Sequence, residues 1–249
     1  KVWRVGFLSG RRHPDSIDAD YYGAFPKRLR ELGYVEGKNL AIEWHFADGK
    51  YERLPASAAE LVRLKVDVIV AGGPPAIIAA QKATTTIPVV MGSVGDPVGS
   101  GLIKSLAHPG GNITGLSNLS SDLGPKHLEM LRSMVPKLSR VAVLTNPTNS
   151  GQAALLKSLE IAAQKFGVKT FPAQAQNSQE IENAFVAMAR EKVGAVVVVL
   201  DPVFIEHRRQ IADLAAKHRL PSITSFREFA DAGGLISYGR SLADQYRRM

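Results

Sequence analysis

The sequence of 249 residues contains no cysteine, which excludes disulfide bonds and metal sites built on thiolates. It also lacks an apolar run long enough to cross a bilayer, so we expect no membrane-spanning helix. No charged segment followed by an apolar one opens the chain, as a secretory leader would. We therefore expect either a cytosolic protein or one whose leader has been removed.

The local motifs of several enzyme classes are also absent. The sequence has no G-x-x-x-x-G-K-[ST], no G-x-S-x-G and no G-x-G-x-x-G after a strand, and its six histidines show no spacing such as H-E-x-x-H. The sequence thus lacks the usual motifs for phosphate transfer, serine hydrolysis, dinucleotide binding and metal catalysis. We predict a protein that is not an enzyme and that holds no metal and no cofactor.

The basic residues exceed the acidic ones, giving a net charge of +8 and a pI near 9.7. Nucleic-acid binding requires these residues to gather on one face. They fall instead into short clusters, at Arg11-Arg12, 27–30, 207–209 and Arg247-Arg248. Such clusters on helical segments are usually solvated charge, so we predict no nucleic-acid partner.

Apolar runs alternate with amphipathic segments along the whole chain, a pattern that predicts an α/β protein with parallel sheets covered by helices. The predicted strands are 3–8, 40–46, 66–71, 87–92, 112–116, 140–145, 168–173, 194–200, 220–225 and 234–238. Helices fill the gaps. The segment 21–33 places Phe25, Leu29 and Leu32 on one stripe and stops at Gly33, and 151–167 repeats this logic with Leu155, Leu159 and Ala162 before Gly167.

The two halves of the chain resemble each other. Aligning Gly33 with Gly167 gives an offset of 134 residues and aligning Pro88 with Pro221 gives 133, so the register holds to within one residue. This repeat predicts two similar, Rossmann-like open α/β lobes. Because open α/β sheets bind ligands at the carboxyl ends of their strands, we expect a ligand held in a cleft between two such ends.

The stretch VDVIVAGGPPAIIAA, residues 66–80, indicates a strand, a tight turn and a helix. Gly72 and Gly73 let the backbone approach a ligand closely, and the start of the helix favours a negatively charged or carbonyl group. The alternative is a plain connection between a strand and a helix, with no ligand.

Three further strings narrow the class of protein: GYVEGKN at 33–39, SVGDPVGSGL at 93–102 and GGNITG at 110–115. Together with the segment around residues 66–92, they strongly resemble the solute-binding proteins of bacterial ABC importers, in the tryptophan/tyrosine-type subfamily. The resemblance covers nearly the whole chain. It implies a type I periplasmic-binding-protein fold with a hinged cleft, a periplasmic or lipid-anchored location, a monomeric state, and ABC permease subunits as partners.

The resemblance also implies a division into lobes. We predict lobe 1 at 1–115, completed by 239–249, and lobe 2 at 116–238, with crossovers at 112–117 and 236–239. Members of the family continue beyond the LISYG string through a further helix and strand, whereas this sequence stops at RSLADQYRRM. We therefore expect the sequence to be truncated.

Candidate ligand-binding residues are those just past the predicted carboxyl ends of strands. They are Ser9, Gly10, Gly72, Gly73, Pro74, Ser93 and Asp96 in lobe 1, and Asn118, Asn146, Asp201, Ser225 and Phe226 in lobe 2. Hydroxyls, amides and helix starts suit a carboxylate, and an aspartate suits an ammonium group. This set predicts a small solute, with an amino acid, aromatic or branched, as the leading candidate.

Some roles stay open. Asp96 and Asp201 each precede a proline, so each either faces the ligand or simply forms a turn and caps the next helix. Aromatic residues near strand ends, such as Tyr22 and Phe204, either line the site or belong to the core. For the protein as a whole, the alternatives to an importer component are a ligand-sensing effector domain of a transcriptional regulator and an α/β enzyme, such as a glycosyltransferase or racemase, that uses the same cleft.

Overall fold

The structure is a computed structural model that describes residues 1–117 and 123–249, apart from the side chain of Ser93. The chain forms two compact units. Unit 1 comprises Lys1–Asn118 and Ser241–Met249, and unit 2 comprises Leu119–Arg240. Among the described residues, none of the helices combines the length and the apolar character that a membrane span requires.

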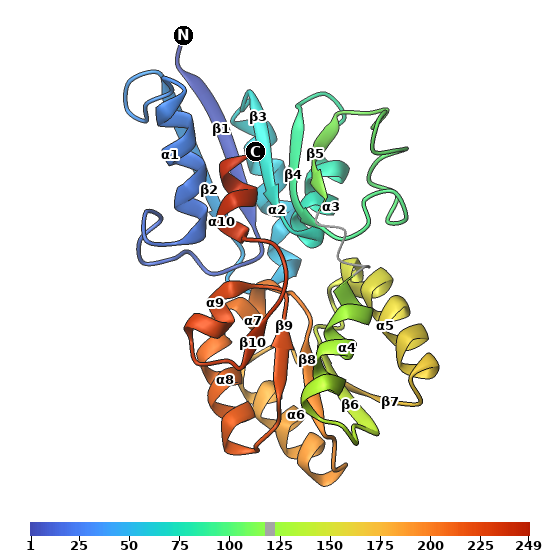
Figure 1. Cartoon of the computed structure of the whole chain (residues 1–249). Coiled ribbons are helices and arrows are strands. Elements are labelled where there is room, and N and C mark those ends of the chain that lie inside the picture. The colour runs from blue at the N-terminus through green and yellow to red at the C-terminus, as the bar shows by residue number, and fades with distance from the viewer. Residues whose placement is uncertain (118–122) are drawn as a thin grey trace. The chain divides into compact units, whose positions relative to one another are not determined.

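Unit 1 is built on a five-stranded parallel sheet with the order β2-β1-β3-β4-β5. Its strands are β1 (Trp3–Ser9), β2 (Leu40–Phe46), β3 (Val68–Gly72), β4 (Val89–Val94) and β5 (Ile113–Ser117). Figure 1 shows these strands running side by side. The inner strands β1 and β3 consist mostly of apolar residues. Such runs are expected of strands that are buried on both faces.

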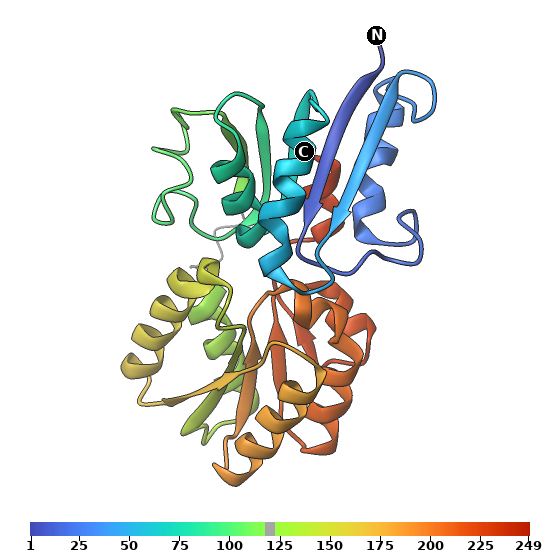
Figure 2. The same cartoon turned by 180° about the vertical axis from the view of Figure 1, so that it is seen from behind.

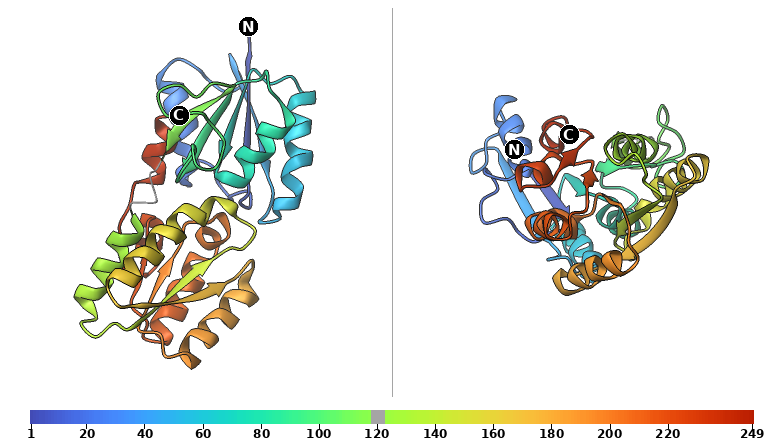
Figure 3. Two further views of the ribbon diagram at one scale, coloured as in Figure 1. Left: turned by 90° about the vertical axis from the view of Figure 1, so that its right-hand side faces the viewer. Right: turned by 60° about the horizontal axis from the view of Figure 1, so that its bottom comes forward.

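Helices cover both faces of this sheet. They are α1 (Ala24–Glu31) and α10 (Leu242–Arg247) on one face, and α2 (Leu54–Arg63) and α3 (Pro74–Ala83) on the other, with short 3-10 turns η1 (Tyr21–Gly23) and η2 (Tyr51–Arg53) (Figures 2 and 3). Side chains alternate along β1. Phe7 packs with α1 and α10, whereas its neighbour Leu8 packs with α2 and α3.

Unit 2 has a second five-stranded parallel sheet, with the order β10-β9-β8-β6-β7. Its strands are β6 (Arg140–Thr145), β7 (Lys169–Gln174), β8 (Ala195–Val198), β9 (Ser222–Thr224) and β10 (Ile236–Ser237). Its helices are α4 (Leu123–Met134), α5 (Ala153–Lys165), α6 (Ser178–Arg190), α7 (Pro202–Glu206), α8 (Arg208–Lys217) and α9 (Arg227–Asp231), with the 3-10 turn η4 (Ser150–Gln152). Helices α4 and α5 share one hydrophobic cluster with the sheet, and α6 and α8 contact each other on its other side (Figure 1).

The internal repeat of the sequence appears as a shared topology. Read from β7, unit 2 has the order β7-β6-β8-β9-β10, which matches β2-β1-β3-β4-β5 of unit 1 element for element. Gly33 follows α1 with φ of +89°, and Gly167 follows α5 with φ of +67°. Both positions need the left-handed conformation that glycine adopts without strain, which explains why the repeat keeps them. The predicted pair of parallel α/β lobes is confirmed.

One predicted helix face is wrong in detail. The segment 21–33 begins as the 3-10 turn η1, and α1 itself ends at Glu31. Phe25 is buried, but Leu32 is the C-cap residue and 56% exposed. The stripe therefore loses its last member because the helix stops before Leu32 can turn toward the sheet. In the second segment, Leu155, Leu159 and Ala162 are all buried, as predicted.

Candidate functional site at the carboxyl edges of the two sheets

Ser9 ends β1 at the carboxyl edge of the unit 1 sheet, and its hydroxyl is already engaged. Its Oγ lies 2.6 Å from the hydroxyl of Tyr22, which comes from η1, and accepts a hydrogen bond of 3.1 Å from the backbone N–H of Arg11. Ser9 has no exposed surface. The predicted binding residue Ser9 thus holds Tyr22 in place.

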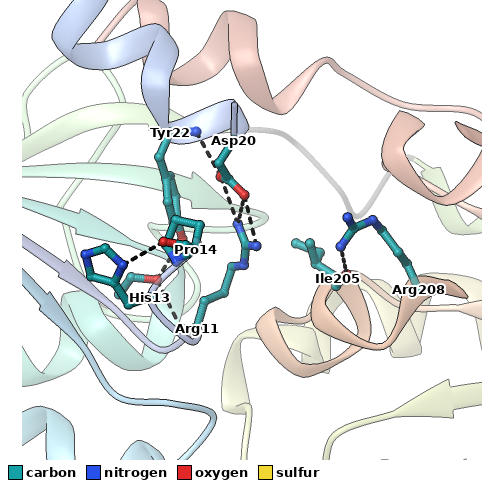
Figure 4. A network of polar contacts seen from close by, with 8 residues as sticks. Arg11, His13, Pro14, Asp20, Tyr22, Ile205 and Arg208 are labelled. Atoms are coloured by element: carbon teal, nitrogen blue, oxygen red, sulfur yellow. Dashed lines mark hydrogen bonds and ion pairs between the residues drawn. The ribbon is translucent and has the colours of Figure 1, made fainter. Parts of the chain in front are cut away.

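Arg11 follows β1 and is a buried residue, not a solvated one. Only 4% of Arg11 is exposed, and its guanidinium bonds to both carboxylate oxygens of Asp20 at 3.0 and 3.1 Å (Figure 4). The guanidinium also lies over the rings of Tyr21 and Tyr22, 4.8 and 5.2 Å from their centroids. Burial disfavours its charge, but Tyr21, Tyr22 and Asp20 outweigh burial and raise the pKa of Arg11. The interpretation of this residue as surface charge is therefore wrong.

Gly72 ends β3 beside two tyrosine hydroxyls. A Cβ atom on Gly72 would lie 2.6 Å from the hydroxyl of Tyr246 and 3.5 Å from that of Tyr22. Tyr246 comes from α10 and packs edge-on against Tyr22, with ring centroids 4.7 Å apart. Burial, together with the neighbouring tyrosines, raises the pKa of Tyr246 well above its usual value, so the phenol stays neutral. Glycine is required here because α10 brings an aromatic ring against the strand.

The turn after β3 has the predicted form, with fewer backbone donors than a helix start normally offers. Gly73 has φ of +86°, and its N–H donates to the carbonyl of Gly92 at 2.9 Å. Pro74 and Pro75 occupy the first two helical positions. Because proline has no N–H, Ala76 is the first residue of α3 that carries one. Space is open at the Cβ position of Gly73, whereas a Cβ on Gly10 would meet the Tyr51 ring at 2.7 Å.

Asp96 follows β4 and forms a turn. Its Oδ1 accepts the N–H of Gly99 at 2.8 Å, and its backbone carbonyl accepts the hydroxyl of Ser100 at 2.6 Å. This is the turn-forming alternative that the sequence left open, and a ligand contact for Asp96 stays a prediction. The backbone of Ser93 lies in β4, but its side chain is outside what the structure describes, and Asn118 lies outside the described residues altogether.

In unit 2 the structure joins two predicted residues directly. Asn146 follows β6, Asp201 follows β8, and the Nδ2 of Asn146 donates to the Oδ1 of Asp201 at 3.1 Å. Asp201 has no exposed surface and caps α7, accepting the N–H of Val203 at 2.9 Å. Nearby, a guanidinium nitrogen of Arg208 donates to the carbonyl of Ile205 at 2.9 Å, which links the end of α7 to the start of α8 (Figure 4).

The remaining predicted residues of unit 2 follow β9. Ser225 is half-buried, and its backbone closely approaches Gly239, where a Cβ atom would collide with the Ser225 carbonyl. Phe226 has no exposed surface and packs against Phe229, with ring centroids 6.0 Å apart. This packing is that of a core aromatic residue, the second of the two interpretations that the sequence allowed.

A buried histidine holds the last strand of unit 2. The Nε2–H of His127, on α4, donates to the carbonyl of Tyr238 at 2.7 Å, while its Nδ1 is buried with no partner among the described residues. Burial lowers the pKa of His127, and the hydrogen bond to Tyr238 opposes this only in part. The N–H of Tyr238 donates to Thr224 at 2.8 Å. The segment just after β10 is therefore fixed from two sides.

The sequence indicated both edges but missed several residues that organise them: Arg11, Asp20, Tyr246, Gln152 and His127. Arg11 directly follows a predicted strand end, and this position was a usable signal. Tyr246 carried no local signal, because its partners Tyr22 and Gly72 lie far away in the sequence. Asn149 lies in the segment 146–150, just past the predicted strand 140–145, so its position was a signal as well. Within the described part of the chain, no group of three histidine, aspartate or glutamate side chains is placed to hold a metal ion.

Comparison with known proteins agrees with this geometry. Residues 11–246 match the family described as ABC transporter substrate binding protein. A tyrosine-binding protein of Clostridioides difficile strain R20291 is 31% identical over 240 residues, which are 96% of this chain and 68% of that protein. A crystal structure of a conserved domain protein from Vibrio cholerae is 29% identical, with a TM-score of 0.90 over 99% of this chain and 82% of that one.

A third similar structure is the ABC domain from Streptococcus pneumoniae in complex with L-Trp, which is 23% identical. Its TM-score is 0.87, over 100% of this chain and 82% of that chain. The fold is that of the type I periplasmic binding proteins. This chain belongs to the family of ABC transporter substrate-binding proteins. It is therefore a solute-binding component of an ABC importer, from a family of binding proteins that work outside the cytoplasm.

Proposed function

We propose that this protein captures an aromatic amino acid and delivers it to the permease subunits of an ABC importer. The observation that carries the proposal is the family match over residues 11–246. Two relatives support the choice of an aromatic amino acid as the solute. The 31% identical protein is named as tyrosine-binding, and the structure from Streptococcus pneumoniae contains L-Trp. The protein works as a monomer, without a cofactor and without chemical turnover of its solute.

The solute binds at the carboxyl edges of the sheets, where open α/β folds place their ligands. The predicted lobes, 1–115 with 239–249 and 116–238, move about the crossovers at 112–117 and 236–239. Space is open at the Cβ position of Gly73, which allows close approach there. The other predicted residues stay candidate contacts: Gly10, Gly72, Pro74, Ser93, Asp96, Asn118 and Ser225.

The test begins with solute that copurifies with the protein. Purified protein is denatured, and the released small molecules are identified by mass spectrometry. Titration calorimetry of stripped protein then measures L-tyrosine, L-tryptophan, L-phenylalanine and L-leucine. We expect binding of an aromatic amino acid, a rise in unfolding free energy of about 2.7 kcal/mol at a hundredfold excess over Kd, and a smaller radius of gyration by small-angle scattering.

Two outcomes contradict the proposal. Recovery of a chemically altered solute after long incubation would favour an α/β enzyme. Absence of any heat with all four amino acids, together with a released molecule of another class, would replace the aromatic amino acid by that class.

A further inference from the structure

Asp201 is surrounded by hydrogen-bond donors from its own unit. Its Oδ1 accepts from Asn146 at 3.1 Å and from the N–H of Val203 at 2.9 Å, and its Oδ2 accepts from Asn149 at 2.8 Å and from Gln152 at 3.4 Å. A carboxylate has about four acceptor positions. Within the described part of the chain, four donors occupy these positions, and the side chain has no exposed surface.

The three donating amides are held at their other ends by the backbone of one loop, residues 146–152. The Oδ1 of Asn146 accepts the N–H of Thr148 at 3.1 Å, and the Oδ1 of Asn149 accepts the N–H of Gly151 at 3.1 Å. The Oε1 of Gln152 accepts the N–H of Asn146, also at 3.1 Å. Each amide thus points its NH₂ group at Asp201 and its oxygen at the loop, so the carboxylate sets the conformation of the whole loop.

This loop links β6 to α5 at the carboxyl edge of the sheet. Asn146 and Asn149 are buried, whereas Pro147, Thr148 and Ser150 are exposed. The hydroxyl of Thr148 donates to the Oδ1 of Asn146 at 2.7 Å, so this hydroxyl is left as an acceptor toward a solute. The side chains that the loop presents outward therefore differ from those that Asp201 binds.

We propose that Asp201 is a positioning residue, which holds the 146–152 loop so that Thr148 and Ser150 face the solute, and that Asp201 does not itself pair with an ammonium group of the solute. This inference rests on the proposed function for the identity of the solute. It makes recognition at this edge depend on hydroxyl and backbone groups instead of a carboxylate. A solute that lacks an ammonium group therefore loses no binding affinity through a missing contact with Asp201.

The first test needs no solute. Asp201→Asn keeps the shape and the acceptor Oδ1, but it turns an NH₂ donor toward the donors of Asn149 and Gln152. We expect amide hydrogen exchange in the 146–152 loop to become about tenfold faster or more, as loss of hydrogen bonds to a charged acceptor implies, while β8 keeps its protection. The control is Asp213→Asn, the same change at an exposed position on α8.

A second variant tests the same hydrogen bonds if Asp201→Asn alone folds poorly. In the double variant Asp201→Asn with Asn149→Asp, the carboxylate lies on the loop and the amide at position 201, so the donor and acceptor are exchanged. A carboxylate at position 149 still accepts the N–H of Gly151. We expect slow exchange of the loop to return. Fast exchange in the double variant, or unchanged exchange in Asp201→Asn, overturns the proposal.

The second test compares two matched solutes, L-tyrosine and 3-(4-hydroxyphenyl)propionate, which lacks only the ammonium group. If Asp201 positions the loop, Asp201→Asn weakens binding of both by the same factor, about tenfold, and the double variant restores both. If only L-tyrosine is weakened, Asp201 contacts the ammonium group and the inference fails. If the parent protein binds neither, the proposed solute is wrong, and the exchange experiment alone decides the role of Asp201.

Discussion

The guanidinium of Arg11 and the carboxylate of Asp20 form a bidentate ion pair inside unit 1, with nitrogen–oxygen distances of 3.0 and 3.1 Å. Arg11 lies just beyond β1, after Gly10, and Asp20 caps η1 by accepting the N–H of Tyr22 at 3.1 Å. The pair therefore fixes both ends of the intervening segment and the ring of Tyr22, which reaches the carboxyl edge of the sheet.

Removing Asp20 is expected to destabilise unit 1 strongly. Asp20→Ala leaves the nearly buried guanidinium of Arg11 without its counter-charge, and such a loss costs about 3–5 kcal/mol. Urea unfolding followed by tryptophan fluorescence measures the change, because both tryptophans, Trp3 and Trp44, lie in unit 1. The exposed Asp18→Ala is the control and is expected to change little. A loss below 1 kcal/mol for Asp20→Ala would show that water replaces the ion pair readily.

The hydroxyls of Ser9 and Tyr22 are expected to be energetically coupled. Their oxygens lie 2.6 Å apart in a buried site, so Ser9→Ala and Tyr22→Phe each leave one hydroxyl or its partners unsatisfied, at about 1–3 kcal/mol each. The double variant removes both groups and should cost less than the sum of the two single changes. Strict additivity in the double-mutant cycle would contradict a direct hydrogen bond.

Gly72 and Gly73 are expected to resist substitution for different reasons. A methyl group on Gly72 meets the hydroxyl of Tyr246 at 2.6 Å, so Gly72→Ala should cost about 1–3 kcal/mol by overpacking. Tyr246→Phe removes the colliding atom and should recover part of that loss. Gly73→Ala has open space, but φ of +86° and ψ of 158° place the residue in a region that almost only glycine adopts, which costs about 1–3 kcal/mol in backbone strain. Tyr246→Phe should leave this second cost unchanged, and equal rescue of both variants would refute the distinction.

His127 is expected to make unit 2 less stable at acidic pH. Burial lowers its pKa in the folded protein below the ordinary value of 6.5, so the unfolded chain binds the proton more readily. Stability is therefore complete above about pH 6.5 and falls as the pH drops through that value. His207 has a pKa lowered mainly by burial and contributes in the same direction.

The variant His127→Gln tests this pH dependence. Glutamine keeps a donor for the carbonyl of Tyr238 but does not titrate, so the loss of stability between pH 7 and pH 5 should shrink without disappearing, since His207 remains. Denaturant midpoints at several pH values provide the measurement. His108→Gln, at an exposed position, serves as the control and should retain the full loss. An identical pH profile for the parent and His127→Gln would falsify this role.

Much of the fold could be predicted from the sequence because its signals are local. Continuous apolar runs such as 194–200 predict central strands of a parallel sheet. Gly33 and Gly167 indicate helix ends at which a residue needs a positive φ. A strand of the structure overlaps each of the ten predicted segments. Leu32 shows the limit: the apolar spacing continues past the residue at which α1 ends, and periodicity alone does not show where a helix stops.

The candidate site could be predicted only as a set of positions. Strand ends suggested Ser9, Gly72, Asn146 and Asp201, and ligand contacts for these residues stay a prediction, because the partners of their side chains lie far away in the sequence. The donors around Asp201 come from a loop about fifty residues earlier. Tyr246 reaches Gly72 only because α10 returns to the first sheet. Such pairings follow from topology, which no short motif contains.

The return of α10 to unit 1 also has a consequence for biosynthesis. Unit 2 is one uninterrupted stretch of chain, whereas unit 1 needs residues from both sides of it. During translation, the segment Leu119–Arg240 has left the ribosome before Tyr246 can pack on Tyr22 and Phe7. The first domain to begin is thus the last to be completed, and until α10 emerges the aromatic face of the first sheet is a surface that a chaperone can bind.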